Sequence, residues 1–298
     1  MGTSSAALFK NGCLIAAVEE ERLSRIKNDN QFPNLAIKEV LDIERIKLSD
    51  VSNIAIYWQP WRVFTRVLGT LKKMMISSNS RKSILNRVQK IFTPSTISKD
   101  GSWFDLFQIK KILKKNHGDF QADINFYDHH LTHQKYGESI KNWGDCISLS
   151  YDGGGEEYST VLSIISEGKK KILTQHKWPN SLGHFYSTFT GFLGFKMLEG
   201  EYKMMGLAPY GKPEYKDKIL SEILILKPNG MYELNVDLCD YHSALKGKFS
   251  KKFEFLFGKK RLNNQKPTQS QINLASSVQE AFFECLHHIL KPAFEEAP

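Results

Sequence analysis

The first twenty residues contain two short apolar runs on either side of a polar turn, which is the pattern of a β-hairpin. Two apolar runs, residues 6–9 and 13–18, flank the dipeptide Asn11-Gly12. Both residues of an Asn-Gly pair tolerate positive φ angles, which a tight hairpin turn requires. After Pro33 the spacing of apolar residues changes to that of a helix, so the sequence predicts a hairpin followed by a helix.

The same patterns divide the rest of the chain into strands and helices. Near the C-terminus, apolar residues recur at helical spacing and share one face of a long helix. These residues are Ala275, Val278, Phe282, Cys285 and Ile289. The predicted strands are 54–57, 124–127, 146–151, 158–165 and 171–177, and the predicted helices are 61–90 (one or two), 105–115, 182–195, 213–226 and 270–290.

Strands and then helices occur twice in succession, which predicts an α/β fold of two tandem units. We place the first unit at 1–143 and the second at 144–298, with a lysine-rich, weakly patterned insertion near 226–268. Both units look incomplete, because the first opens on a hairpin without a preceding strand and the second stops soon after its last helix. Part of the apolar face of that helix is therefore expected to be exposed.

Composition excludes several classes of protein. No apolar run reaches the roughly 18 residues of a membrane-spanning helix, and the first residues lack the regions of a signal peptide. The four cysteines form no CxxC pair, which predicts buried thiols in a reducing cytoplasm. An aromatic content of 12% argues against global disorder. The sequence thus predicts a folded, cytoplasmic protein.

The formal net charge of +9 is concentrated in residues 62–115, which carry 13 Lys or Arg and two acidic residues. Such a segment can contact phosphate groups, or it can form the solvated face of a helix. No RNP, zinc-finger or KH signature accompanies it, so the sequence does not favour a nucleic-acid partner.

The segment DHHLTH, residues 128–133, contains three of the nine histidines. On a helix, His129 and His133 are four residues apart and share one face. That spacing suits two ligands of one metal ion. Because no thiol is nearby, the other ligands would be oxygen atoms, which favours a divalent metal such as Fe, Mn or Zn. The alternative is an exposed or hydrogen-bonded histidine cluster.

A second candidate site follows the predicted strand 146–151. Asp152, Gly153, Gly154, Gly155 and Glu156 form an acidic, glycine-rich turn. Backbone N–H groups of such glycines can approach an anionic ligand closely, and the two acids can hold a metal or a hydroxyl. An ordinary glycine turn between strands is the alternative.

A third candidate is GEYKMMGLAPYG, residues 200–211, where Glu201 and Lys203 lie between apolar residues. A charged pair in so apolar a loop indicates the lining of a pocket. The alternative is a helix cap followed by a tight turn. No P-loop, GxGxxG or GxSxG motif occurs in the chain.

Taken in order, eight segments resemble the carbamoyltransferase family that includes the nodulation-type and antibiotic-tailoring O-carbamoyltransferases. They are SSAALFKNG, AAVEEERLSRIK with FP following, YWQPW, DHHLTH, SYDGGGEE, NSLGHFYSTFTGFLGF, EGEYKMMGLAPYG and ASSVQEAF. These segments cover nearly the whole chain, and DGGGE and GLAPYG are the most specific of them.

The resemblance implies the N-terminal part of a catalytic domain with the actin-like ATPase (RNase H-like) fold, similar to the tRNA threonylcarbamoyl-transferring proteins. In the family, carbamoyl phosphate and ATP give a carbamoyl-adenylate in a separate domain, and the actin-like domain passes the carbamoyl group to an acceptor hydroxyl. The resemblance places a metal on His129 and His133, and implies that residues 152–156 contact the nucleotide or the metal region. Charge that develops during transfer requires a cation, which the metal on the phosphate and a lysine can supply. We expect Lys27 and Lys203 to be catalytic residues of this kind, and the alternative for each is an ordinary surface lysine.

The chain also departs from the family. Gly2 and Thr3 stand where the family has a His-Asp pair, Asn28 stands where a histidine usually follows the lysine, and Gln134-Lys135 replace small residues. The family's third metal ligand (an aspartate), its adenosine-binding segment and its adenylate-forming domain have no recognisable counterpart.

We therefore expect a partial enzyme that does not transfer a carbamoyl group alone, and that forms a homodimer or needs a complementing chain. Its partner would be a small acceptor molecule with a hydroxyl, and not a membrane. Two alternatives stay open: a non-catalytic remnant that acts as an interaction module, and an RNA-associated relative of the tRNA-modifying proteins.

Overall fold

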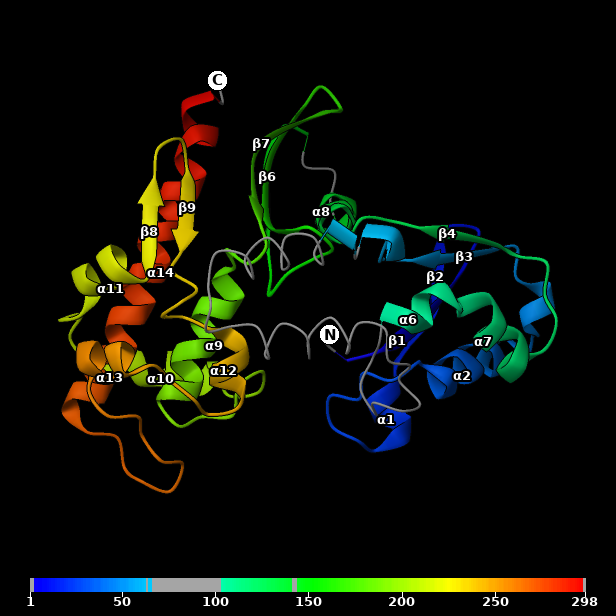
Figure 1. Ribbon diagram of the computed structural model, residues 1–298. Coiled ribbons are helices and arrows are strands. Elements are labelled where there is room, and N and C mark those ends of the chain that lie inside the picture. The colour runs from blue at the N-terminus through cyan, green and yellow to red at the C-terminus, as the bar shows by residue number, and fades with distance from the viewer. Residues whose placement is uncertain (1–2, 63, 66–102, 141–143, 297–298) are drawn as a thin grey trace. The chain divides into compact units, whose positions relative to one another are not determined.

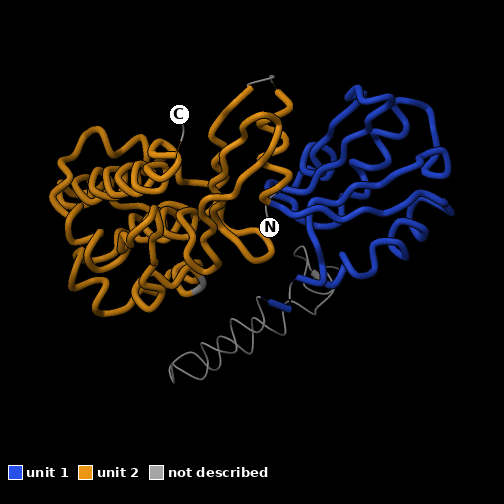
Figure 2. Tube along the Cα trace, turned by 90° about the horizontal axis from the view of Figure 1, so that it is seen from above, with its two compact units in different colours: residues 1–129 blue, residues 130–298 orange. Residues whose placement is uncertain are grey.

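The computed structural model describes residues 3–62, 64–65, 103–140 and 144–296. It is a mixed α/β structure that divides into two compact units, Met1–His129 and His130–Pro298 (Figure 2). The predicted lobe limits, 1–143 and 144–298, stay a prediction. Most of the helices and the loop predicted between residues 61 and 101 lie outside the described residues, as does much of the basic segment 62–115.

The first unit opens with the predicted hairpin (Figure 1). Strands β1 (Ser5–Lys10) and β2 (Cys13–Glu19) pair in antiparallel fashion, with Lys10 opposite Cys13. Between them, Asn11 and Gly12 have φ angles of 53° and 78°. Two consecutive positive angles are what a two-residue turn of the hairpin type requires. The hairpin predicted from Asn-Gly is confirmed.

Glu20 connects the helix α1 (Glu20–Ser24) to the helix α2 (Asn34–Glu44). Its buried carboxylate accepts the backbone N–H groups of Leu35 at 3.1 Å and Ala36 at 2.7 Å. These N–H groups lie in the first turn of α2 and have no acceptor within the helix. The positive end of the helix dipole also favours a carboxylate there. Glu20 therefore fixes the start of α2 against the end of β2.

The remainder of the first unit packs two parallel strands against helices. Strand β3 (Asn53–Ile56) pairs with β4 (Asp123–Phe126), and the helices α6 (Trp103–Phe107) and α7 (Ile109–His117) precede β4. The buried core consists of Leu41, Leu48, Ile109, Leu113, Phe120 and Ala122. The lysines of α7 are exposed, so this described part of the basic segment is a solvated helix face.

Helix α8 (His129–Ile140) leads into the sheet of the second unit. That sheet has the order β5 (Cys146–Tyr151), β6 (Tyr158–Ser166) and β7 (Lys169–Lys177), and both pairings are antiparallel. The three strands predicted here are confirmed. The middle strand β6 is buried at five successive positions. Because successive side chains of a strand point to opposite faces, both faces of the sheet are covered there.

Further helices and a second hairpin complete this unit. They are α9 (Leu182–Phe192), α10 (Glu201–Leu207), α11 (Lys216–Glu222), β8 (Leu224–Lys227), β9 (Met231–Leu234), α12 (Tyr241–Leu245), α13 (Lys251–Phe257) and α14 (Gln269–Glu296).

Helix α14 confirms the long C-terminal helix, but less of its apolar face is exposed than we expected. Ala275, Val278, Cys285 and Ile289 on that face are fully buried, and Phe282 is partly buried. The face is covered because α10, α11 and the β8–β9 hairpin pack along α14 (Figure 1). Of these elements, α11 lies within the predicted helix 213–226, whereas α10 and β9 come from segments in which no helix or strand was predicted.

One other prediction is wrong in the second unit. Residues 201–210 form α10 and a short 3₁₀ turn rather than a loop, and the side chain of Met204 is fully buried. The lysine-rich, weakly patterned segment near 226–268 contains β9, α12 and α13, and its assignment as an insertion stays a prediction. In this segment the lysines are largely exposed, while Tyr232, Phe253 and Phe257 are buried. The high lysine content made the short apolar patterns of these elements difficult to recognise in the sequence.

The cysteines divide into two groups. Cys239 and Cys285 are buried, and burial raises the pKa of each thiol to about 12. Cys13 is exposed, contrary to the prediction of buried thiols, because the turn end of the first hairpin is open and also exposes Phe9 and Leu14. Among the helices that the structure describes, none has the length and apolar content to cross a membrane.

Candidate metal centre

Helix α8 presents two pairs of polar side chains at helical spacing. His129 and His133 form one pair, and His130 and Gln134, one residue further along, form the other. The segment before the helix is held by Asp128, whose carboxylate pairs with Arg62 at 3.1 Å. The two pairs point to different surroundings because one residue advances a helix by about 100°.

His129, His133 and Asp152 form a group that could hold a metal ion. One ligand atom from each lies within 4.8 Å of the others. The Nε2 atom of His133 is 3.6 Å from Oδ2 of Asp152. His129 is buried and packs on Trp58, with 4.6 Å between ring centroids. The group therefore combines two imidazoles from α8 with a carboxylate from the end of β5.

The sequence analysis placed Asp152 in the predicted nucleotide-binding turn and allowed that its carboxylate holds a metal or a hydroxyl. The structure brings Asp152 to the two histidines, which agrees with the metal option. The sequence signal was present, because Asp152 directly follows the last residue of β5. Nothing in the sequence indicated that α8 packs beside the end of β5.

His130 is a residue to which the sequence analysis gave no role. It is buried, with Nε2 at 2.9 Å from the carbonyl oxygen of Tyr158 and Nδ1 at 2.6 Å from the hydroxyl of Ser150. A carbonyl only accepts, so Nε2 carries the proton; in the neutral ring Nδ1 then accepts from Ser150. His130 thus links α8 to β5 and β6 and is not available as a ligand.

The glycine turn after Asp152 lies against the start of α9. Asp152 accepts a hydrogen bond through its backbone oxygen from Ser181, which also caps α9. A Cβ atom on Gly183 would lie 2.7 Å from the backbone nitrogen of Gly153. Only glycine at position 183 allows this approach, which brings the turn and the helix start together.

Within the turn itself, Gly154 has a φ of 147°, a conformation that side chains rarely adopt. The N–H of Gly155 donates to the carbonyl oxygen of Tyr158 at 2.7 Å, and Glu156 is almost completely buried. Glu156 therefore belongs to the interior, whereas Asp152 is partly exposed. That this turn binds a nucleotide stays a prediction.

The two predicted catalytic lysines lie in different units. Lys27 is exposed in the turn after α1, and Lys203 is exposed on α10, with Nζ 5.7 Å from the ring centroid of Tyr202. Their catalytic roles stay predictions. Glu201, which the sequence analysis placed in the same pocket, has a structural role. Its carboxylate accepts the Ser187 hydroxyl at 2.6 Å and a backbone N–H at 2.8 Å.

The charge of Glu201 also acts on two tyrosines. Burial raises the pKa of Tyr186 to about 12, and the carboxylate of Glu201 adds to the effect. The pKa of Tyr241 is raised to about 12 by the same two causes. Both phenols therefore stay protonated at neutral pH, and the hydroxyl of Tyr186 donates a hydrogen bond to Gln279.

Comparison with known proteins is consistent with this geometry. The chain matches the family model described as carbamoyltransferase N-terminus over residues 2–292. An uncharacterized protein of Synechocystis sp. is 34% identical over 305 residues, which cover 98% of this chain and 47% of that protein. Nodulation protein NolNO of Sinorhizobium fredii is 29% identical over 291 residues, which cover 98% of this chain and 38% of that protein.

A shorter match links the chain to nodulation protein NolO of Bradyrhizobium diazoefficiens, with 31% identity over 110 residues that cover 37% of this chain and 20% of that protein. The chain spans less than half the length of these relatives. The family model nevertheless extends over nearly every residue, including α8, the glycine turn and most of α14. The chain belongs to the carbamoyltransferase family and matches the part that forms its N-terminus.

Proposed function

We propose that this chain forms the metal- and nucleotide-binding part of an enzyme that transfers a carbamoyl group from carbamoyl-adenylate to the hydroxyl of an acceptor. The observation that carries the proposal is the approach of His129, His133 and Asp152 to within 4.8 Å in a chain of the carbamoyltransferase family. We further propose that the two units are lobes of an actin-like fold. Carbamoyl phosphate and ATP would be the sources of the carbamoyl-adenylate.

The donor set fits a divalent metal. Two imidazoles and one carboxylate are ligands that Fe, Mn and Zn accept, and such a set leaves positions for water or substrate oxygens. Two further features agree with a ligand role: His133 and Asp152 are both partly exposed, and His129 is held on an aromatic ring. When bound, the metal would supply a positive charge that polarises phosphate or carbonyl oxygens of the substrate.

The reaction that these residues would support is an acyl transfer. The acceptor oxygen bonds to the carbamoyl carbon, the bond from that carbon to the adenylate phosphate breaks, and AMP leaves with the bonding electrons. The hydroxyl proton passes to water or to a neighbouring base. We propose that the phosphate lies beside this turn at Gly154, where the absence of a side chain and a φ of 147° allow the backbone to approach an anion closely.

Lys27 and Lys203 are the proposed cations for the charge that develops on the leaving phosphate. Their exposure is compatible with contact to a bound substrate. We propose a small molecule with a hydroxyl group as the acceptor.

Metal analysis of the purified full chain tests the proposal. We expect about one Mn²⁺, Fe²⁺ or Zn²⁺ per chain in the wild type and far less in His133→Ala. His287→Ala is a matched control, because His287 is also exposed on a helix but lies on α14. Equal metal content in wild type and His133→Ala would contradict the proposal.

Nucleotide binding is measured on the same proteins by thermal melts with ATP, ADP or AMP. The metal-loaded wild type is expected to gain several degrees in Tm. No shift with any of the three nucleotides would contradict the nucleotide part of the proposal while leaving the metal part in place.

A further inference from the structure

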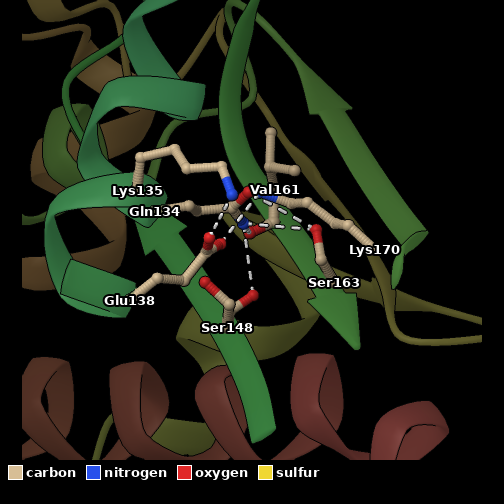
Figure 3. A network of polar contacts seen from close by, with 7 residues as sticks. All are labelled: Gln134, Lys135, Glu138, Ser148, Val161, Ser163 and Lys170. Carbon is tan, nitrogen blue, oxygen red and sulfur yellow. Dashed lines mark hydrogen bonds and ion pairs between the residues drawn. The ribbon is translucent and has the colours of Figure 1, made fainter. Parts of the chain in front are cut away.

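The buried face of α8 is fastened to the sheet by side chains that were not assigned any part in the metal centre. Gln134 is almost completely buried, and its amide lies between the strands β5 and β6 (Figure 3). The amide nitrogen donates to the carbonyl oxygen of Ser148 at 3.2 Å and to that of Val161 at 3.1 Å. The hydroxyl of Ser163 lies 3.4 Å from both the nitrogen and the oxygen of the amide.

These contacts reach both strands at the same level of the sheet. Ser148 on β5 is the register partner of Ser163 on β6, and Val161 is two residues away on β6. One side chain therefore ties a helix to two neighbouring strands at once. His130, one turn earlier on α8, makes the equivalent pair of contacts to Ser150 and to the start of β6.

Of the two strands that Gln134 contacts, β5 leads directly to Asp152, the third candidate ligand. From Ser148 the strand β5 continues through Ser150 to Tyr151, and Asp152 follows. On the helix, Gln134 is the residue after His133. The same side chain thus fixes the part of α8 that holds His133 and, through a short rigid strand, the position of Asp152.

We infer that Gln134, supported by His130, is a positioning residue that sets the separation of His133 and Asp152 and so determines the affinity of the site for a divalent metal. This inference rests on the proposed function, since it needs a metal at that site. The physical reason is that a metal tolerates only small errors in ligand distance, so supporting residues typically contribute 10- to 100-fold in affinity.

The outer half of α8 provides an internal comparison. Glu138 pairs with Lys135 at 2.6 Å and with Lys170 of β7 at 3.4 Å (Figure 3). Burial acts to raise the pKa of Glu138, but the two lysines outweigh it and the pKa lies below its ordinary value. This ion pair lies more than one turn beyond His133 and contacts β7 rather than β5, so its loss should disturb the centre far less than the loss of the Gln134 amide.

The experiment compares Co²⁺ binding by the wild type, Gln134→Met and two controls, using the visible absorption bands of Co²⁺. Methionine keeps the length of the side chain but removes the hydrogen bonds of the amide. Gln134→Met should raise the Kd for Co²⁺ about 10- to 100-fold and change the position or intensity of the bands, because Asp152 no longer meets His133 correctly.

Tyr186→Phe and Glu138→Gln are the controls. Tyr186→Phe removes a hydrogen bond of 2.7 Å between α9 and Gln279 on α14, away from the centre. It should lower the Tm by a few degrees without changing the bands, and Glu138→Gln should change the Kd by no more than about twofold. If Gln134→Met does not fold, Ser150→Ala is the milder test, because it removes the partner of Nδ1 of His130. It should raise the Kd several-fold.

The possible outcomes distinguish a failure of the positioning role of Gln134 from a failure of the proposed metal site. Wild-type Kd and bands in Gln134→Met, or in Ser150→Ala where that variant is used, would overturn the positioning role and leave the metal centre in place. Failure of the wild type to bind Co²⁺, or equal binding by His133→Ala, would overturn the proposed function itself. A weakened Kd with altered bands in Gln134→Met, beside unaltered bands in Tyr186→Phe, is the expected result.

Discussion

A buried histidine in the second unit leads to a specific prediction about acid stability. His176 on β7 is only 1% exposed and stacks on Tyr232 of β9, with 4.1 Å between ring centroids. Neither ring nitrogen makes a hydrogen bond of normal geometry to any residue that the structure describes. Burial lowers the pKa of His176 from 6.5 to about 4; the backbone of Tyr232 opposes this slightly, and the charge of His288 adds to it.

The sign of the effect follows from where the proton binds. Above pH 6.5 the imidazole is neutral in both the folded and the unfolded chain, so it causes no pH dependence. Between pH 6.5 and about 4 the unfolded chain binds a proton that the folded chain does not. Stability therefore falls as the pH falls through this window. Each pH unit removes about 1.4 kcal/mol, which gives about 3 kcal/mol over the whole window.

The measurement is urea denaturation of the wild type and His176→Phe at several pH values from 7 to 4, followed by far-UV circular dichroism. Phenylalanine keeps a ring against Tyr232 but binds no proton. All other titrating groups are common to both proteins, so they cancel in the difference of their unfolding free energies. That difference should shift in favour of His176→Phe by about 3 kcal/mol between pH 7 and pH 4.

His287→Phe serves as the control, because His287 is exposed and should give a pH profile parallel to that of the wild type. Parallel profiles for the wild type and His176→Phe would refute the reasoning. Such a result would mean that the folded protein accepts a proton on the buried ring as readily as the unfolded chain does.

Three glycine substitutions give further predictions. Gly211→Ala places a Cβ atom 2.4 Å from the carbonyl oxygen of Ile272 and should lower the free energy of unfolding by about 1–3 kcal/mol in urea denaturation. Gly206→Ala, within α10 and with no atom within 4 Å of its Cβ, should instead stabilise by about 0.5–1 kcal/mol; a loss in Gly206→Ala equal to that in Gly211→Ala would contradict both. Gly154→Val, at a φ of 147°, should reduce the Tm gain from ATP or ADP more than it reduces the Tm without nucleotide. An unchanged gain would argue against a nucleotide at this turn.

Local signals in the sequence predicted the elements whose patterns are complete within a few residues. Asn11 and Gly12 specify the first hairpin, and the spacing of Ala275, Val278 and Ile289 specifies α14. These predictions succeeded because turn geometry and helical periodicity depend on neighbouring residues alone.

The elements that sequence analysis missed depend on distant partners. Residues 200–211 looked like a loop because of their glycines and proline, yet the burial of Met204 and the approach of Gly211 to α14 make them helical. For Asp152 the sequence left both a nucleotide and a metal open, and only the packing of α8 beside β5 brings this carboxylate to His133. Buried polar contacts such as those of Gln134 have no signature of their own in the sequence, because their partners are backbone groups.

On α8, the pair His130 and Gln134 lies one residue further along than the pair His129 and His133. This arrangement limits the insertions and deletions that the helix can accept. Deleting one residue between His130 and His133 would rotate everything that follows by about 100° relative to the start of the helix. Gln134 would then occupy the position of His133, and Lys135 would enter the buried place of the amide, where an unpaired ammonium is very unfavourable. We therefore expect deep mutational libraries to recover substitutions at Leu131 and Thr132 far more often than single-residue deletions or insertions there. The number of residues between His130 and His133, more than the identity of Leu131 and Thr132, is therefore what natural selection has to preserve.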